Sequence, residues 1–173
     1  MVSLSQQANR ELFHRLVHRY FTSDCLSEDN PPRVVNRRKL NQFAREFIRL
    51  EKLLADDSRE KFLCLYFIGI IRFHLEQYNA AHQWLKKAME TRPEEAYVFM
   101  DMYAGCLFIL KWRQHRYLEA REEAFKYLFM GMKEAERKSD WDTYHRLKEK
   151  LSLFYGEKTN FLDIDMGNDS ADV

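Results

Sequence analysis

Glycine and proline are scarce in this chain of 173 residues, which contains five glycines and three prolines. Architectures that are rich in β-turns depend on these two residues, so their shortage argues against such a fold. Hydrophobic residues make up 46% of the chain and aromatic residues 14%, which is too much for a disordered polymer. The composition therefore favours one helical domain with a real hydrophobic core.

The chain also lacks a large excess of charge and a long hydrophobic run. Its formal net charge of +1 gives no overall attraction to nucleic acid or to an anionic membrane. The longest apolar stretch, residues 62–75, contains Arg72 and His74 and is shorter than the ~20 residues of a membrane-spanning helix. The first residues are polar where a signal peptide has an apolar run. We therefore expect a soluble, cytoplasmic protein with no membrane partner.

Motifs for phosphate binding, cofactor binding and catalysis are missing as well. The sequence has no Gly-x-Gly-x-x-Gly and no Gly-Lys-Ser/Thr segment, and no local Ser/His/Asp or Cys/His arrangement. Cys25, Cys64 and Cys106 fit no metal-binding spacing, and their odd number indicates reduced thiols in a cytosol-like compartment. We therefore expect no cofactor and no enzymatic activity.

The stretch 62–93 gives the strongest structural signal. Its first half is apolar on almost every side, so a helix there must be covered by neighbours, because uncovered apolar surface costs ~25 cal/mol per Å². Its second half has an apolar stripe on one side only and stops at Pro93. These patterns predict a buried helix, a turn at 76–78 and an amphipathic helix.

Further helices are predicted around this pair, because apolar residues recur at intervals of three and four over about 3–21, 36–55, 94–114, 118–138 and 141–155. A loop with paired prolines is predicted at 22–34. The expected fold is an all-α domain of about seven helices over residues 1–156. Residues 157–173 have five acidic residues against one lysine and are expected to form a disordered tail, in which Phe161, Leu162, Ile164 and Met166 look like a short linear motif.

An internal repeat links two of the predicted turns. Tyr78-x-x-Ala81 and Tyr117-x-x-Ala120 lie 39 residues apart, and each segment opens a helix. A small residue allows two helices to cross closely, so Gly69 and Ala81 are expected at the first crossing and Gly105 at the next. The first unit contains a small residue, an aromatic at the turn, an alanine, a large apolar residue, a second alanine and a final proline. In order, these are Gly69, Tyr78, Ala81, Leu85, Ala88 and Pro93.

This pattern resembles the tetratricopeptide repeat. The resemblance is good over 60–93 and loose over 94–127, and the aromatic that the family has three residues after Gly69 is Arg72 here. It implies an antiparallel helix-pair array, a tetratricopeptide-like α-solenoid, with a concave groove that binds peptides or protein segments. The carboxylate clamp of some members does not carry over, because Tyr66 and Ile70 occupy the corresponding face.

The resemblance implies a non-catalytic protein-binding module, such as an adaptor, an assembly factor or a chaperone-like scaffold. Short all-helical secretion chaperones of similar length are a narrower version of this interpretation. Helical spacing suggests a groove formed by the third, fifth and seventh helices, with Tyr66, Arg72, Tyr103, Lys111 and Arg113 as candidate contacts. Trp112, beside Arg113, is a further candidate because tryptophan and arginine are enriched in binding hot spots. A homodimer is also expected, because a short array has apolar ends that need covering.

A basic segment supports an alternative function in nucleic-acid binding. The candidate phosphate contacts are Arg37, Arg38, Lys39, Arg45 and Arg49. Proteins that bind single strands interleave basic residues with exposed aromatics, whereas Phe43 and Phe47 lie here on the apolar seam of the helix. A solvated helix face and an acidic protein segment are the other two interpretations of this patch.

A second alternative is a helical metalloprotein. Glu11, His14 and His18 are spaced so that one helix presents them together, as in sites for zinc or iron. No second Glu-x-x-His follows in the sequence, and no third ligand is marked nearby. We therefore expect exposed histidines and no metal.

Overall fold

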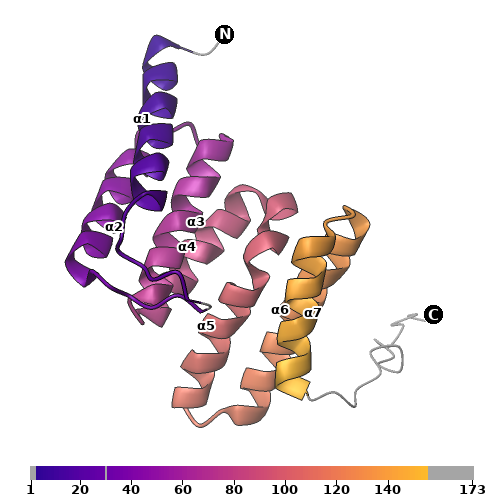
Figure 1. Ribbon diagram of the computed structural model, residues 1–173. Helices are drawn as coiled ribbons and strands as arrows, with labels where there is room; N and C mark the ends of the chain where they lie inside the picture. The colour runs from indigo at the N-terminus through magenta and orange to yellow at the C-terminus, as the bar shows by residue number, and fades with distance from the viewer. Residues whose placement is uncertain (1–2, 30, 156–173) are drawn as a thin grey trace.

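The fold consists of α-helices, as the periodicity predicts (Figure 1). The computed structural model describes residues 3–29 and 31–155. The helices are α1 (Leu4–Phe21), α2 (Arg37–Glu51), α3 (Arg59–His74), α4 (Tyr78–Thr91), the 3₁₀-helix η1 (Pro93–Phe99), α5 (Met100–Arg113), α6 (Tyr117–Arg137) and α7 (Trp141–Tyr155). The predicted tail at 157–173 lies outside the described residues.

Polar side chains fix where four of the helices begin. Ser3, Asn36, Ser58 and Asp140 each accept a hydrogen bond from the backbone N–H three residues further on, with distances of 2.9 to 3.2 Å. Such a cap satisfies one of the free N–H groups of the first turn and contributes ~1 kcal/mol to helix stability. The starts of α1, α2, α3 and α7 are therefore encoded locally.

Three of the turns between helices share one geometry. Glu76, His115 and Ser139 have φ angles of 61°, 60° and 57°, in the left-handed region. In each turn the next residue donates its N–H to the carbonyl five positions earlier, at 2.9 to 3.0 Å, which is the longer bond of a Schellman motif. Glu76 and His115 are 39 residues apart, so the turns repeat with the period of Tyr78 and Tyr117.

The single helix predicted over 94–114 is wrong in its first part, which forms η1 before α5 begins at Met100. Pro93 starts η1 and has no N–H to donate to a helical ladder. Ala96 and Phe99 are both buried, and residues three apart eclipse each other in a 3₁₀-helix. The tighter helix therefore places both side chains against the core.

The helices form two layers. Helices α1, α3, α5 and α7 make the first layer, in which each contacts the next, and α2, α4 and α6 make the second and pack between them. We call the first group the A layer. Figure 1 shows α1 and α2 at one end of the array and α7 at the other. This is the antiparallel helix-pair array that the sequence predicts.

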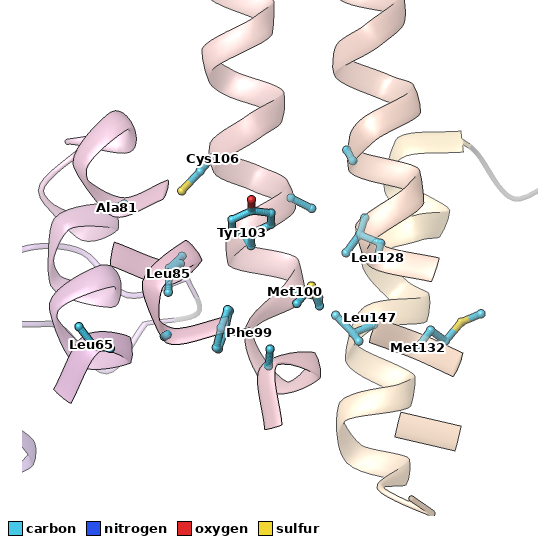
Figure 2. Close-up of a cluster of buried hydrophobic side chains, with 14 of the residues drawn as sticks. Leu65, Ala81, Leu85, Phe99, Met100, Tyr103, Cys106, Leu128, Met132 and Leu147 are labelled. Atoms are coloured by element: carbon cyan, nitrogen blue, oxygen red, sulfur yellow. The ribbon is translucent and has the colours of Figure 1, made fainter. Parts of the chain in front are cut away.

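Helix α3 belongs to both halves of the hydrophobic core. Its residues Phe62 and Leu65 join the cluster built by α4, η1, α5, α6 and α7, which Figure 2 shows in close-up. Its residues Cys64, Phe67 and Ile71 join a second cluster with α1 and α2. The all-round apolar pattern of this helix therefore has the predicted cause, which is burial between neighbours on several sides.

The expected roles of the glycines are only partly correct. A Cβ atom on Gly69 would lie 2.5 Å from a side-chain carbon of Leu85, one turn after Ala81, so Gly69 does allow α3 and α4 to approach closely. Gly105 instead faces Phe73 of α3, at an ordinary 3.6 Å. The close approach in the second half is at Gly131 of α6, which was not expected to have this role.

Candidate protein-binding surface

A row of partly buried and exposed aromatic side chains runs along the turn ends of α3, α4, α5 and α6. Trp112, in the last turn of α5, is 47% exposed. Its ring stacks on Phe108 at a centroid distance of 5.3 Å and meets Tyr117 edge-to-face at 4.4 Å. The tryptophan is therefore held in place while much of its surface remains open to solvent.

The row continues across the preceding repeat. The Arg113 guanidinium lies 5.1 Å from the ring centroid of Tyr78, and that ring meets Phe73 at 5.5 Å. We call Phe73, Tyr78, Trp112, Arg113 and Tyr117 the aromatic edge. Tryptophan, tyrosine and arginine are the residues most enriched in binding hot spots. The aromatic edge therefore has the composition of a protein-binding surface.

The aromatic edge borders the A-layer surface. Gly105, Ile109 and Trp112 follow one another on α5 at steps of four and three, so they share one face of that helix. Phe73 of α3 packs over Gly105. Ile70 and Ile109 are half-buried on the two neighbouring helices. The A layer thus presents a partly apolar surface between α3 and α5.

The other candidate groove residues lie in different surroundings. Tyr66 is half-buried and stacks on Phe99 of η1 at 5.4 Å, and burial raises its pKa. Lys111 faces α6, where its Nζ lies 3.3 Å from Glu119 and 3.0 Å from Glu123. Lys111 is therefore part of the α5–α6 contact and not of the A-layer surface.

Arg72 and Tyr103 differ in their surroundings, and only Tyr103 is buried. The Arg72 Nη1 donates to the Gln77 side-chain oxygen at 2.7 Å, within the α3–α4 turn. Tyr103 is only 3% exposed, its hydroxyl lies 3.1 Å from the Nε2 of His82, and burial raises its pKa. Helix α5 has neighbours on several sides, so a position off its main apolar stripe is still covered. Tyr103 is a core residue.

The partial burial of His82 predicts a loss of stability in acid. Burial lowers the pKa of His82 from 6.5, Lys86 adds to this effect, and Glu123 opposes it. Below that usual value the unfolded chain takes up a proton that the folded chain resists, so the free energy of unfolding falls as the pH drops. Urea midpoints at neutral and mildly acidic pH measure this fall. The His82→Gln variant keeps a polar partner for Tyr103 but cannot titrate, so it should show a smaller fall. An equal fall of the urea midpoint in the variant would show that His82 is not the cause of the acid sensitivity.

A second apolar groove lies between η1 and α6, and nothing in the sequence pattern pointed to it. It has a volume of about 530 Å³ and is lined by Met89, Pro93, Ala96, Tyr97, Met100, Phe129, Met130, Gly131, Lys133, Glu134 and Arg137. Met130 is 51% exposed at its edge. The rim charges pair with each other or with close neighbours, as Arg137 does with Glu134. This groove is the main alternative to the A-layer surface.

The predicted basic patch divides into two groups. Arg37 donates to the backbone oxygen of Leu75 at 3.1 Å, and Lys39 pairs with Asp24 at 2.7 Å. Arg38, Arg45 and Arg49 are exposed and have no ion-pair or hydrogen-bond partner among the described residues. The first two residues therefore hold α2 in place, whereas the other three arginines are available to a ligand.

No metal site forms around Glu11, His14 and His18 in the part of the chain that the structure describes. All three side chains are exposed on α1, and no group of three or more potential ligands comes together over 3–29 and 31–155. Glu11 lies 3.7 Å from Arg15.

The three cysteines are free and buried, and burial raises the pKa of Cys64 and of Cys106 to about 12. None of the helices over residues 3–29 and 31–155 has the length and hydropathy needed to cross a membrane.

The stacked helix pairs, the repeated turns and the alanines at the helix crossings define a tetratricopeptide-like helical-repeat fold. Among solved structures, the chain resembles the type III secretion translocator chaperone SycD of Yersinia enterocolitica, at 16% sequence identity and a TM-score of 0.59 over 87% of this chain and 92% of that chain. A second structure of SycD, in an alternative dimer, gives 16% identity and a TM-score of 0.62 over 89% and 96%. This likeness is one of fold. No protein-family model and no curated protein matches the sequence.

Proposed function

We propose that this protein is a non-catalytic protein-binding module, in the manner of a chaperone-like scaffold or adaptor. Its ligand is a helix or an extended segment of a partner protein, bound on the A-layer surface next to the aromatic edge. The observation that carries this proposal is Trp112, which is fixed between Phe108 and Tyr117 and yet is 47% exposed. A preordered aromatic side chain loses little conformational entropy on binding, which favours a role as an anchor.

The shape of the molecule supports the same conclusion. Helices α3, α5 and α7 lie side by side in one layer, so their exposed faces form a continuous surface that a chain segment can follow. Two solved structures with a similar fold are of a secretion translocator chaperone, a protein whose name states a chaperone role. A chaperone that binds a segment of one client protein in a reducing cytoplasm is the narrower form of the proposal, and the buried free thiols are compatible with that compartment.

The Trp112→Ala variant tests this proposal. The full chain, immobilised in wild-type and variant form, captures proteins from a lysate of its own source cells, and the bound proteins are quantified by mass spectrometry. Removing a hot-spot tryptophan costs ~2 kcal/mol or more, so the amount of partner captured at limiting concentration should fall by at least about tenfold. Thermal unfolding checks that the variant remains folded.

Two further variants make the result specific. Trp141→Ala removes another half-exposed tryptophan and should leave capture unchanged, because Trp141 begins α7 and so lies at the end of the A layer opposite to the aromatic edge. Met130→Lys places a charge in the groove between η1 and α6 and should also have no effect. If Met130→Lys abolishes capture while Trp112→Ala does not, the partner binds in that groove and the A-layer proposal is wrong.

A further inference from the structure

A groove between α1 and α2 lies apart from the surfaces considered so far. It has a volume of about 360 Å³, and its lining residues are Leu12, Arg15, Leu16, Arg19, Glu46, Arg49, Leu50 and Leu53. All of them belong to α1, to α2 or to the turn after α2, so the groove lies at the α1–α2 end of the array. Leu12 and Leu53 are 47% and 54% exposed. The groove therefore has a leucine floor that is open to solvent.

A stripe of unpaired positive charge runs along α2, and Arg49 of this stripe lines the groove. Arg38, Arg45, Arg49 and Lys52 follow one another at steps of seven, four and three, so they form one stripe along α2. All four are exposed, and none has an ion pair or side-chain hydrogen bond within the described residues. Arg19, across the groove, is by contrast held by Glu46 through bonds of 2.8 and 3.3 Å. A ligand that suits this site has apolar side chains interleaved with acidic ones.

The chain itself contains such a segment. From Leu162 to Met166 its sequence alternates apolar residues with Asp163 and Asp165, and residues 157–173 hold five acidic residues against one lysine. We propose that this segment of one molecule binds the α1–α2 groove of a second molecule. In an extended bound segment, alternate side chains face opposite ways, so Leu162, Ile164 and Met166 would contact the leucine floor while the two aspartates reach the arginines. This inference does not depend on the proposed function.

The length of chain after α7 favours the second molecule. Neighbouring packed helices have axes ~8–10 Å apart, so three steps along the A layer put roughly 24–30 Å between the axes of α1 and α7. From Tyr155, where α7 ends, the chain extends by at most ~3.6 Å per residue, which gives about 25 Å to Leu162 and about 40 Å to Met166. Helices α1 and α2 lie at the opposite end of the array from α7, so the chain would also have to pass around the helices between (Figure 1). Binding within one molecule would thus need an almost fully extended connection, whereas the groove of a second molecule carries no such requirement.

Nucleic acid is the competing ligand for the arginine stripe. Sites for single strands combine positive charge with exposed aromatic rings that stack on bases. No aromatic residue lines the α1–α2 groove, and its floor is leucine. The aromatic rings nearest to the stripe along α2, Phe43 and Phe47, are buried. The chemistry of the groove thus favours an apolar acidic peptide over a nucleic acid.

Charge reversal on each side of the contact tests the inference in the full chain. Sedimentation velocity follows self-association of the wild type over the micromolar range at low and high salt. Arg45→Glu with Arg49→Glu should raise the dissociation constant at least about tenfold, and so should Asp163→Lys with Asp165→Lys. An equimolar mixture of these two variants should associate, because the reversed groove then meets the reversed segment. A control with Lys86→Glu and Lys126→Glu, on α4 and α6, makes the same change in net charge as the groove variant and should associate like the wild type.

Several results would overturn the inference. One is a wild-type chain that remains monomeric throughout the concentration range. Another is self-association that persists in both reversed variants, which would place the contact elsewhere on the molecule. In a third result, the protein binds a labelled single-stranded RNA, the groove variant loses this binding, and the variant with Asp163→Lys and Asp165→Lys keeps it. Self-association is then the same in both variants as in the wild type. That third pattern would assign the arginine stripe to nucleic acid.

Discussion

Replacing Phe67 by alanine is expected to lower the free energy of unfolding by about 3–5 kcal/mol. The Phe67 ring stacks on Phe47 of α2 at 5.3 Å and meets Tyr20 of α1 at 5.7 Å and Phe13 of α1 at 6.5 Å. It is therefore the ring of α3 against which both N-terminal helices pack. Its removal leaves a cavity among large rings that cannot collapse without moving a helix. Chemical denaturation followed by circular dichroism measures the loss.

A matched phenylalanine separates this effect from a general loss of aromatic area. Phe21 contacts the same Phe67 ring at 5.7 Å but is 68% exposed at the end of α1. Phe21→Ala should therefore cost less than about 1 kcal/mol. Proteolysis within the 22–36 connection should become faster in Phe67→Ala, because α1 and α2 lose their common support. Equal stabilities for the two variants would show that Phe67 is not the centre of this cluster.

The positions of the helices could be predicted from the sequence because the signals for them are local. Caps such as Ser58 and Asp140 act on the N–H groups three residues away, and an apolar stripe on one helix reports one buried face. Leu85 and Ala88, in the best-matching repeat, are fully buried as their spacing implies. The unpredicted element, η1, depends on where Ala96 and Phe99 meet the core, which no local signal encodes.

The candidate site could be predicted only in part, because exposure depends on neighbouring helices. Trp112 and Arg113 were proposed from their composition, and the structure places both at the aromatic edge. Tyr103 and Lys111 lie on the same helix, but α4 and α6 cover Tyr103, and Lys111 forms an ion pair with α6. A helical wheel shows the faces of one helix and cannot show how many of them are covered.

The three surfaces lie on different parts of the array, which has a consequence for assembly. The aromatic edge is formed at the turns between α3 and α4 and between α5 and α6, the second groove lies between η1 and α6, and the third lies at the α1–α2 end. None of their lining residues is shared. The proposed partner site at the aromatic edge and the proposed self-association site at the α1–α2 groove therefore do not compete for the same residues. A contact between unlike surfaces also extends to rings or chains of molecules, unlike a two-fold dimer.

Replacing Gly131 by valine is expected to lower the free energy of unfolding by about 2–3 kcal/mol, although glycine is itself a poor helix former. A Cβ atom on Gly131 would lie 2.7 Å from the Cβ of Met100 on α5 and 3.0 Å from a methyl carbon of Leu147 on α7. The Cβ of Met100 is fixed to the backbone and cannot turn away. The new side chain would therefore force α5 or α7 away from α6, and chemical denaturation measures the cost.

Substitution of Gly105, on α5, is expected to have the opposite effect on stability. A Cβ atom there would meet only the Phe73 ring, at an ordinary 3.6 Å. Alanine is a better helix former than glycine by ~1 kcal/mol, so Gly105→Ala should stabilise the protein by about 0.5–1 kcal/mol, whereas Gly131→Ala should destabilise it. The same substitution thus has opposite signs at two helical glycines, because one faces a movable ring and the other faces the Cβ of Met100, which is fixed to the backbone of α5. If Gly131→Ala stabilised the protein, the proposed close packing of Gly131 against Met100 and Leu147 would be wrong.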